Sequence, residues 1–469
     1  MPKVHIPGPW LAKFTVLPLV LRQALRRNFD GLHGPHSVVQ TGPRRVSVND
    51  ARGLRDVFLS APVRRLDRYP NLVFLHNYAA ENIISTVDGD THHDRRRIVQ
   101  PSYAATLAVS EELKGVVSRA AEGFLALRER EQGQRPLGNA DVKPLLRLAL
   151  ADIMSHVVYG RAHETNTLRD PEQRSLLQKD ADFHDWRISR SASSFFALLF
   201  PDTTLWLRKN LGWSPRGHDI TLINRPHTDK LGRAALLALQ HGRTTVGACP
   251  MERMYRHLVE NGPTPAVPSL EYILSDCVDH FWAGVNTPLD PLVALLKKLD
   301  EPQNGRIRQK LEAELGEAAL PHGGSPFDIP ATVLSRLPLL DAVIRETLRL
   351  YPPVPFGLER RVTKREGGII VGGHFIPAGW IVGAAPETLH RRPDIFAQPG
   401  EWRPERWLAG GDGATDEARR ASLGDMKRHF YAFGAGPRMC IGVNVAWTAM
   451  RGLVAGIYGR PPRTSMRTP

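Results

Sequence analysis

Apolar residues recur with the spacing of an α-helix along most of this chain. The longest helical segment is predicted to begin after Ser269, a residue suited to cap a helix, and to run to about Leu299. Strand-like alternation is confined to residues 35–60 and 356–385. We therefore expect a mainly α protein with a small β region, an α+β fold. Helices are predicted within residues 104–130, 143–160, 226–261, 270–299 and 339–350, and from about residue 440.

Length and composition favour a single folded unit. The 469 residues would suit one large catalytic unit or about three small domains, but no repeat and no linker divides them. The proportions of hydrophobic (42%) and charged (23%) residues exclude a disordered chain, a collagen and a polytopic membrane protein. The apolar stretch at residues 14–21 contains Pro18 and is too short to span a bilayer. It is expected to lie at a membrane surface or to form the first packed helix.

Charge and cysteine content narrow the classes of function. Lys and Arg number 62 against 48 Asp and Glu, a net charge of +14 that would attract nucleic acid, an anionic membrane or an acidic protein. The arginines are scattered, and no zinc-finger spacing, RNP-like segment or basic zipper accompanies them, so nucleic-acid binding is not expected. Cys249, Cys277 and Cys440 lack the spacing of a disulfide framework or a zinc site. At least one cysteine is therefore a candidate for chemistry.

One ten-residue segment crowds three glycines around a single cysteine, and apolar periodicity resumes directly after it. A glycine-rich loop can approach something flat and bulky, and this one delivers Cys440 to the start of a helix. Unpaired N–H groups there stabilise a thiolate, and Arg438 adds positive charge. A buried cysteine in a glycine turn is the structural alternative. The defined positions of the segment are Phe433, Gly434, Gly436, Arg438, Cys440 and Gly442.

This segment resembles the haem-binding signature of the cytochrome P-450 family, the haem-thiolate monooxygenases. It matches Phe-Gly-x-Gly-x-Arg-x-Cys-x-Gly at every defined position. The resemblance implies that Cys440 is the axial ligand of the iron of haem b, that Arg438 contacts a haem propionate, and that the glycines let the loop lie against the porphyrin. Residues 429–433, which lead into the motif, look most like those of fungal microsomal members, often found in specialised metabolism.

Two charged segments match the family in the same order along the chain. Glu346 and Arg349 correspond to its Glu-x-x-Arg, and their spacing places both on one face of a helix. Arg406, within residues 403–407, corresponds to its Pro-Glu-Arg-Phe segment and would complete a charge triad. A buried triad loses solvation, so its expected role is to fix the loop around Cys440 rather than to add stability.

The long helix carries Ala-Gly-Val-Asn-Thr, which resembles the oxygen-binding groove of the family. The resemblance implies that Ala283 and Gly284 leave room beside the iron and that Thr287 hydrogen-bonds dioxygen or a water. The family usually has an acid where this chain has Asn286, which cannot titrate but can hold a water. Pro288 has no N–H, so the carbonyl of Gly284 loses its partner and the helix is expected to kink.

A weaker match concerns the haem propionates. His92 and Arg96 stand where the family has Trp-x-x-x-Arg, and imidazole and guanidinium donors suit carboxylates. A solvated basic face is the alternative for this arginine-rich helix. Arg361 is a further candidate contact, although its neighbour Arg360 would serve if that side chain faces inward.

The resemblance implies a monooxygenase that inserts one atom of dioxygen into a small apolar organic substrate. Electrons would come from an NADPH-dependent flavoprotein reductase, because no flavin, nicotinamide or iron–sulfur motif is present. An acidic face on that partner would suit the net charge of +14. The alternative is a degenerate member that binds haem but is catalytically weak, which Asn286 and Pro288 motivate.

The ends of the chain differ from those of eukaryotic members, which usually begin with a membrane anchor and continue past the last helix into β-strands. This sequence starts near their proline-rich hinge and ends in a polar tail, residues 460–469. Residues 1–30 are therefore expected to contact a membrane surface, and residues 31–469 to form one haem-thiolate domain without the last C-terminal strands. The resemblance places the protein on the cytosolic face of the endoplasmic reticulum, or in the cytoplasm if no anchor exists.

Overall fold

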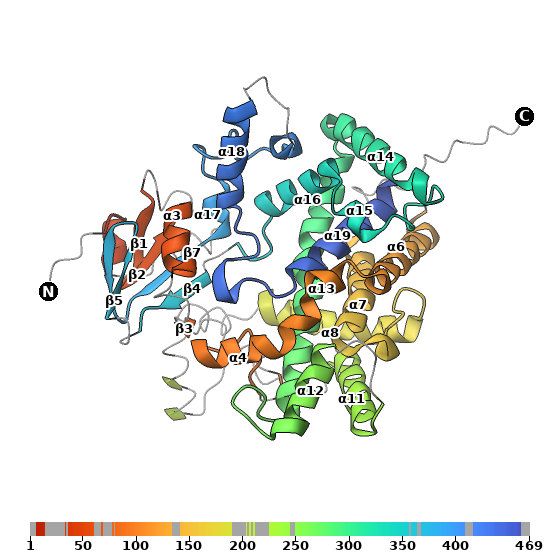
Figure 1. Ribbon diagram of the computed structural model, residues 1–469, viewed down its shortest axis with the longest axis horizontal. Coiled ribbons are helices and arrows are strands. Elements are labelled where there is room, and N and C mark those ends of the chain that lie inside the picture. Colours follow the sequence, from red (N-terminus) through yellow and green to blue (C-terminus); the bar gives the residue numbers. More distant parts are fainter. Residues whose placement is uncertain are drawn as a thin grey trace, which may run out of the picture.

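Helices dominate the structure and strands are few, which confirms the predicted fold class. Figure 1 shows the strands gathered at one end of the molecule and the long helices at the other. The computed structural model describes residues 6–14, 33, 36–60, 67–68, 77–78, 80–133, 141–189, 203, 206–207, 210–211, 225–243, 249–355, 358–363, 367–408 and 416–460.

A five-stranded sheet joins the N-terminal part of the chain to a segment more than 300 residues later, in the order β1-β2-β7-β4-β3. β1 and β2 form an antiparallel hairpin, β2 pairs in parallel with β7, and β4 pairs antiparallel with β7 and β3. A separate hairpin contains β5 and β6. The strands are β1 (Val38–Gly42), β2 (Arg45–Val48), β3 (Asp67–Arg68), β4 (Leu358–Arg361), β5 (Gly368–Val371), β6 (His374–Pro377) and β7 (Ile381–Ala384).

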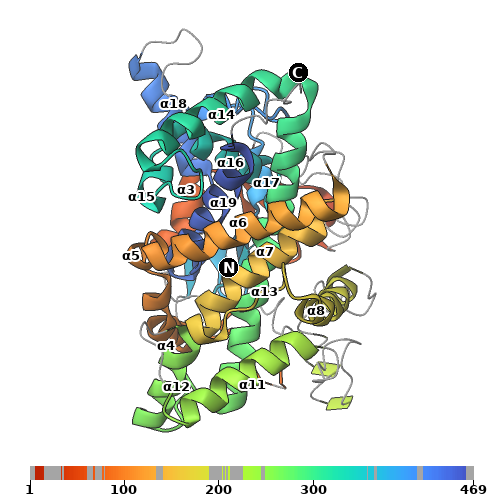
Figure 2. The same cartoon turned by 90° about the vertical axis from the view of Figure 1, so that its right-hand side faces the viewer.

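The central element is α13 (Leu270–Asp300), which runs through the middle of the helical part (Figure 2). The Ser269 hydroxyl accepts a hydrogen bond from the backbone N–H of Tyr272 at 3.2 Å and caps its start. The helix continues through Pro288 and Pro291, which supply no N–H to the carbonyls one turn earlier.

The remaining helices pack around α13 or cover the sheet. The α-helices are α3 (Ala51–Leu54), α4 (Gly89–Val99), α5 (Ala105–Ala108), α6 (Glu111–Gln132), α7 (Lys143–Tyr159), α8 (Pro171–Ser189), α11 (Pro226–Gln240), α12 (Pro250–Asn261), α14 (Gly305–Ala319), α15 (Ala331–Leu334), α16 (Pro338–Leu350), α17 (Pro386–His390), α18 (Asp416–His429) and α19 (Val443–Tyr458). The short 3-10 or π turns are η1 (Trp10–Lys13), η2 (Arg55–Leu59), η5 (Gln100–Tyr103), η7 (Arg161–His163), η9 (Pro302–Asn304), η10 (Leu320–His322), η12 (Pro404–Trp407) and η13 (Gly436–Arg438).

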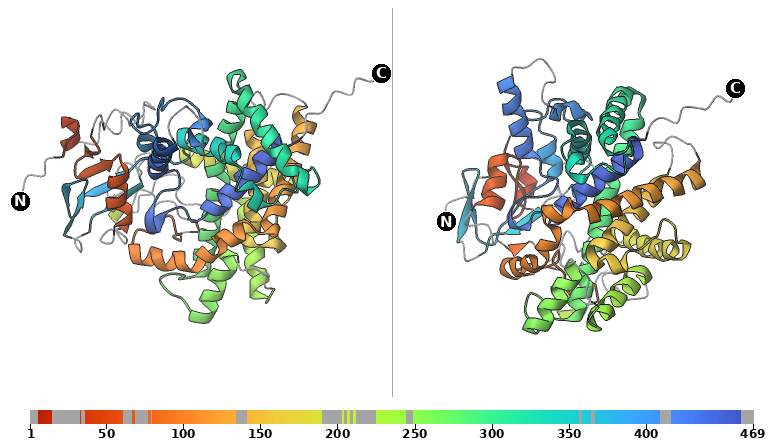
Figure 3. Two further views of the ribbon diagram at one scale, coloured as in Figure 1. Left: turned by 45° about the horizontal axis from the view of Figure 1, so that its top comes forward. Right: turned by 45° about the vertical axis from the view of Figure 1, so that its right-hand side comes forward.

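Two apolar cores hold these elements together. The larger core is formed by the buried faces of α6, α7, α13, α16 and α19. The smaller core lies beneath the sheet and includes Val46, Val382, Phe58 and Tyr431. The segment between α18 and α19 carries the cysteine motif and connects the sheet end of the molecule to the helical part (Figure 3). Within the described ranges, no helix combines the length and the apolar character needed to cross a bilayer.

Candidate functional site

The cysteine loop has a backbone shape that only glycine adopts easily. Gly434 and Gly436 have φ values of 72° and 71°, in the left-handed region. A Cβ added at Gly436 would lie 2.0 Å from the carbonyl oxygen of Phe58, so the loop passes directly against η2. The N–H of Cys440 then donates to the carbonyl of Phe433 at 2.8 Å and closes the loop.

Cys440 lies three residues before the first residue of α19, Val443, as the motif predicts. The Cys440 side chain is accessible to solvent at its surface, yet protein atoms surround the sulfur closely and shield it from bulk water. This desolvation raises the pKa of the Cys440 thiol, while the amide of Gly442 and the guanidinium of Arg96 act in the opposite direction. Coordination to a metal ion would deprotonate the thiol outright.

The structure brings Glu346, Arg349 and Arg406 together as a buried cluster. Arg349 binds the Glu346 carboxylate with two hydrogen bonds of 2.9 and 2.8 Å, and Nε of Arg406 donates to the same carboxylate at 3.0 Å. Both Glu346 and Arg349 have side chains that are 0% exposed. The donors left over on the two arginines are satisfied by backbone carbonyls, which balances the cost of burying charge. These carbonyls belong to His390, Pro399, Glu401, Ala397 and Gln398.

His390 connects this cluster to the cysteine loop, although no motif in the sequence marks it. Its Nδ1 lies 2.9 Å from the carbonyl of Arg349, and its Nε2 accepts the N–H of Tyr431 at 2.8 Å. Burial lowers the pKa of His390 to about 3, and the charge of Arg349 acts in the same direction. The ring is therefore neutral near pH 7, with one nitrogen donating and the other accepting. Only the folded contacts reveal this bridge, because no local pattern marks it.

The predicted oxygen-binding segment lies at the middle of α13. Ala283 is exposed although most of its neighbours on this helix are buried, so the helix borders an open space there. The Thr287 hydroxyl donates to the carbonyl of Ala283 at 2.8 Å. Gly284 has a different surrounding: an added Cβ would lie 2.4 Å from the sulfur of Met154, so this glycine permits close packing of α13 on α7.

Asn286 is the polar residue of this segment that lacks hydrogen-bond partners for its side chain among the described residues. Neither its amide oxygen nor its amide nitrogen has a hydrogen-bond partner in the described part of the chain, and both atoms are buried. A buried amide without partners is costly and usually marks an ordered water or another bound group. The carbonyl of Gly284, which Pro288 deprives of its helical partner, lies on the same stretch of helix.

The arginines of α4 have distinct roles. Arg96 donates to the carbonyl of Met439 at 2.7 Å and thereby reaches the cysteine loop, and His92 of the same helix is buried. Arg95 is not part of a solvated face: it is 5% exposed and pairs with Glu81 at 2.9 Å. Sequence periodicity could not separate these neighbours, because Arg95, Arg96 and Arg97 are consecutive and a run of identical residues shows no periodicity.

Arg438 and the pair on β4 complete the set of predicted basic residues. Arg438 donates to the carbonyls of Thr86 and Val87, each at 2.8 Å, and so ties the cysteine loop to the segment before α4. Arg360 is buried, with its guanidinium 5.1 Å from the ring centre of Phe58, whereas Arg361 is only partly buried. Arg360 therefore packs against Phe58 of the smaller core, and Arg361, the next residue of the strand, lies on the opposite face of β4 and stays the candidate propionate contact.

These residues fit a haem. Cys440 is accessible at the end of the glycine-constrained loop, and Ala283 is accessible in the middle of a helix whose other residues are mostly buried. Arg96 lies close enough to influence both Cys440 and His280, which is one turn before Ala283. Cationic side chains at this edge suit propionates, and a thiolate suits iron.

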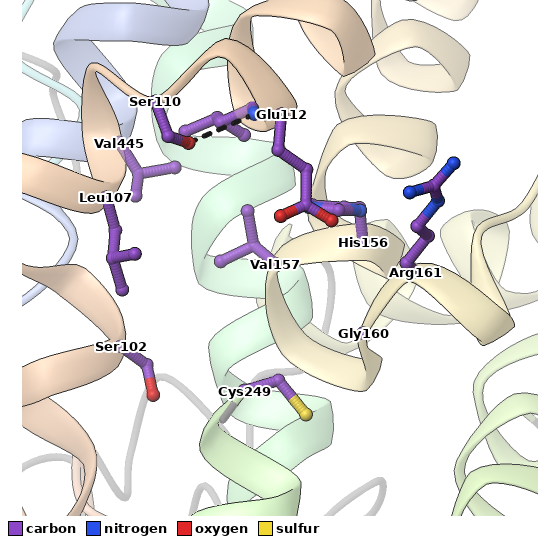
Figure 4. A pocket seen from close by; sticks show the side chains of 11 residues that line it. Ser102, Leu107, Ser110, Glu112, His156, Val157, Gly160, Arg161, Cys249 and Val445 are labelled. Carbon is purple, nitrogen blue, oxygen red and sulfur yellow. Dashed lines mark hydrogen bonds and ion pairs between the residues drawn. The ribbon is translucent and has the colours of Figure 1, made fainter. Parts of the chain in front are cut away.

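A cavity of about 90 Å³ lies apart from this site (Figure 4). Glu112, His156 and Arg161 line one side of it, and Leu107, Val157 and Val445 supply apolar walls. Neither the cysteine loop nor the 283–287 segment contributes to its lining. It therefore does not belong to the site built around Cys440.

The helical fold with a small sheet, the glycine-constrained cysteine and the small-residue segment on the long helix fit the class of thiolate-haem proteins. The chain belongs to the cytochrome P-450 family, whose model matches residues 8–457. It is similar to the cytochrome P-450 monooxygenase FGM1 of Gibberella zeae, with 26% identity over 97% of this chain and 86% of that protein. It is 31% identical to the cytochrome P-450 monooxygenase hkm5 of Aspergillus hancockii, over 96% of this chain and 83% of that protein.

The chain is also similar to the N-acetyltryptophan 6-hydroxylase ivoC of Emericella nidulans, with 26% identity over 97% of this chain and 85% of that protein. Membership of the family and these relatives identify the chain as a P-450 monooxygenase, an oxidoreductase. The family carries haem on a cysteine ligand, uses dioxygen, and requires an electron donor and an organic substrate.

Proposed function

We propose that this chain binds haem b through Cys440 and inserts one atom of dioxygen into a small apolar organic substrate. An NADPH-dependent flavoprotein reductase would supply the electrons. The observation that carries the proposal is the accessible sulfur of Cys440 at the end of a loop held by Gly434 and Gly436. When bound, a thiolate-ligated haem supplies the oxygen activation, since the thiolate pushes electron density onto iron.

The side chains of this protein would hold the cofactor and manage protons. Cys440 is the proposed iron ligand, and Arg96, Arg438, His92 and Arg361 are the proposed donors to the haem propionates. Phe433, Gly434, Gly436 and Gly442 shape the loop, and Glu346, Arg349 and Arg406 fix the chain that leads into it. Ala283 keeps the middle of α13 narrow beside the haem, and Gly284 holds that part of the helix in place by letting it pack closely on Met154 of α7.

Thr287 and Asn286 are the proposed proton-handling residues. The Thr287 hydroxyl donates its hydrogen bond to the carbonyl of Ala283, so its oxygen is left to accept a hydrogen bond from a water. The unpartnered amide of Asn286 would bind that water and orient it. Since an amide does not titrate, the proton would arrive through water rather than from an acidic side chain.

The first test is spectroscopic. The reduced protein with carbon monoxide is expected to show the red-shifted Soret band of thiolate-ligated haem, and Cys440→Ala should lose it. Retention of that band in Cys440→Ala would overturn the ligand assignment. Substrate-induced spectral shifts and NADPH-dependent products are then measured with a terpenoid, polyketide, fatty-acid and aromatic panel. Full haem loading without any product would favour the degenerate alternative.

We also propose that the N-terminal segment contacts a membrane surface, on the cytosolic face of the endoplasmic reticulum. Trp10 and Phe14 support this, since their rings pack edge to face and remain 69% and 71% exposed. Residues 1–5 and 15–30 of the predicted segment lie outside the described residues. Trp10→Ser with Phe14→Ser should reduce binding to lipid vesicles, whereas Val259→Ser with Leu320→Ser, two other exposed apolar positions, should not.

A further inference from the structure

A buried hydrogen-bonded group lies between α13 and the segment that follows α4. The hydroxyl of Tyr103, in η5, is 2.8 Å from Nδ1 of His280, and both side chains are buried. On the far side of the imidazole, Nε2 of His280 lies 3.2 Å from the carboxylate of Asp276, one helical turn earlier. Three titratable side chains therefore stand in series inside the protein.

The Tyr103 end of this series lies beside the cysteine loop. A Cβ added at Gly442 would lie 4.0 Å from the ring carbons Cδ1 and Cε1 of Tyr103. The side-chain amide of Asn444 donates to the carbonyl of Tyr103 at 3.1 Å. The negative charge of a Cys440 thiolate lies close enough to act, together with burial, in raising the pKa of the Tyr103 phenol. Tyr103 is thus the tyrosine that packs against the loop of the proposed iron ligand.

The Asp276 end compensates charge. One carboxylate oxygen accepts the backbone N–H of Ile83 at 2.6 Å, and the other faces His280. Burial is the largest influence on the pKa of His280 and lowers it, as does the charge of Arg96, but the charge and hydrogen bond of Asp276 together with the charge of Asp279 outweigh them, so the pKa is raised. An imidazolium at His280 is therefore stabilised inside the fold.

Three other buried tyrosines lack this arrangement, and a fourth, Tyr272, is hydrogen-bonded to the carboxylate of Asp276 rather than to an imidazole. The hydroxyls of Tyr159, Tyr431 and Tyr458 have no hydrogen-bond partner among the described residues. A phenol that loses an electron becomes a strong acid, so its oxidation is easy only where a base takes the proton at the same moment. Among these buried tyrosines, Tyr103 has such a base, the ring nitrogen of His280, within hydrogen-bond distance.

We propose that Tyr103 is a redox-active tyrosine that gives up one electron when the haem-loaded protein meets a peroxide in the absence of substrate, while its proton moves to Nδ1 of His280. The inference rests on the proposed function, because bound haem would be needed for the peroxide to act as the oxidant. The peroxide takes two electrons and two solvent protons as its O–O bond breaks, and it leaves as water and an alcohol or acid. Tyr103 would supply one of the two electrons and the bound haem the other, so that this chain is left with a neutral tyrosyl radical at Tyr103 and an imidazolium at His280.

The step is reversible. An electron from a reductant and the proton held on His280 restore the phenol, while the carboxylate of Asp276 offsets the positive charge in between. The expected consequence is protection of the cysteine ligand. When no substrate is present, Tyr103 is oxidised in place of the sulfur of Cys440.

The test is electron paramagnetic resonance of the haem-loaded protein, frozen soon after mixing with a peracid. Wild type should give a tyrosyl signal, identified by its change when the chain is labelled with ring-deuterated tyrosine. Tyr103→Phe should lose most of the signal. His280→Gln should lose it as well, because the amide accepts a hydrogen bond but cannot keep the proton. If Tyr103→Phe does not fold, His280→Gln carries the test, since it leaves the tyrosine in place.

Tyr159→Phe is the matched control, because Tyr159 is equally buried but has no base, and it should retain the signal. A signal that survives both Tyr103→Phe and His280→Gln would overturn the proposal, as would the absence of any tyrosyl signal in wild type. The carbon monoxide band is recorded on the same samples. Normal thiolate-haem with no Tyr103 signal refutes the relay alone, whereas a chain that takes up no haem refutes the proposed function and the relay with it.

Discussion

Single glycines decide the shape of the cysteine loop. Gly436 combines a left-handed φ of 71° with contact against the backbone of η2, so a side chain there meets both a torsional and a steric penalty. Other glycines, such as Gly316 within α14, have nothing within 4 Å of an added Cβ. The same substitution should therefore have opposite effects at the two positions.

Gly436→Ala is expected to destabilise the protein by more than about 2 kcal/mol and to impair haem incorporation, because the loop must move away from Phe58. Gly316→Ala should stabilise it by about 0.5–1 kcal/mol, because alanine favours the helix. Urea unfolding and the ratio of haem to protein check both. Equal stability of the two variants would contradict this account of the loop.

His390 gives the protein a specific sensitivity to acid. Its pKa is about 3 in the folded chain against 6.5 in the unfolded chain, so the unfolded state binds an extra proton between these values. Stability contributed by the neutral ring is complete above pH 6.5 and declines as the pH falls toward 3, at about 1.4 kcal/mol per pH unit.

His390→Gln removes that titration while keeping one donor and one acceptor. Its stability deficit relative to wild type should shrink as the pH is lowered below 6.5, and should stay constant between about pH 7 and 8. Urea unfolding at a series of pH values measures the difference. Parallel stability curves across the whole range would show that the ring does not titrate as inferred.

Residues with local signatures could be predicted from the sequence, whereas residues defined by long-range contacts could not. Cys440 and the Glu346 triad belong to motifs, so the spacing of those motifs predicts their chemistry. His390, Arg95 and Tyr103 owe their roles to partners that lie 41, 14 and 177 residues away along the chain. No periodicity records such pairings, because burial and proximity arise only when the elements pack.

At the scale of elements, the buried triad joins α16 to the segment that carries η12. The Glu346 carboxylate accepts hydrogen bonds from two arginines and also from the indole of Trp407 at 2.9 Å. An exposed pair on α14, Arg308 with Glu312 at 2.8 Å, provides the contrast, since its side chains are 42% and 33% exposed. Comparing substitutions at the two sites therefore shows how much of the free energy of unfolding depends on burial of the ion pair rather than on charge pairing itself.

Glu346→Gln should cost about 3–5 kcal/mol, because it leaves the charges of Arg349 and Arg406 buried without an anion. Glu312→Gln should cost no more than about 1 kcal/mol, as is usual for a solvated pair. Thermal and urea unfolding of the two isosteric variants decide the matter. A small loss in Glu346→Gln would mean that the backbone carbonyls around the arginines suffice.

Element boundaries followed the sequence closely where caps and prolines mark them. α13 begins after Ser269 as predicted, and α16 begins at Pro338 and ends at Leu350, two residues before Pro352. The sheet order was not predictable, because β2 pairs with β7 across more than 300 residues. Gly284 illustrates the same limit. The sequence resemblance placed it on the haem side of the helix, yet a Cβ added at Gly284 would point toward Met154 of α7.

At the scale of the whole molecule, the net charge of +14 bears on the proposed reductase. Opposite charges on two partners raise their association rate, and salt weakens this attraction because the Debye length falls to about 10 Å at 0.1 M. Electron transfer from an acidic reductase should therefore slow as ionic strength rises. Lys427 is exposed in the last turn of α18, just before the cysteine loop, and is placed to contribute.

Lys427→Glu should raise the KM for the reductase and reduce its dependence on salt. Lys310→Glu makes the same change of charge on α14, which lies away from the cysteine loop (Figure 1), and should have a smaller effect on both. Reduction of the haem followed at several salt concentrations measures these effects. Equal responses in the two variants would mean that total charge, rather than charge beside the cysteine loop, guides the partner.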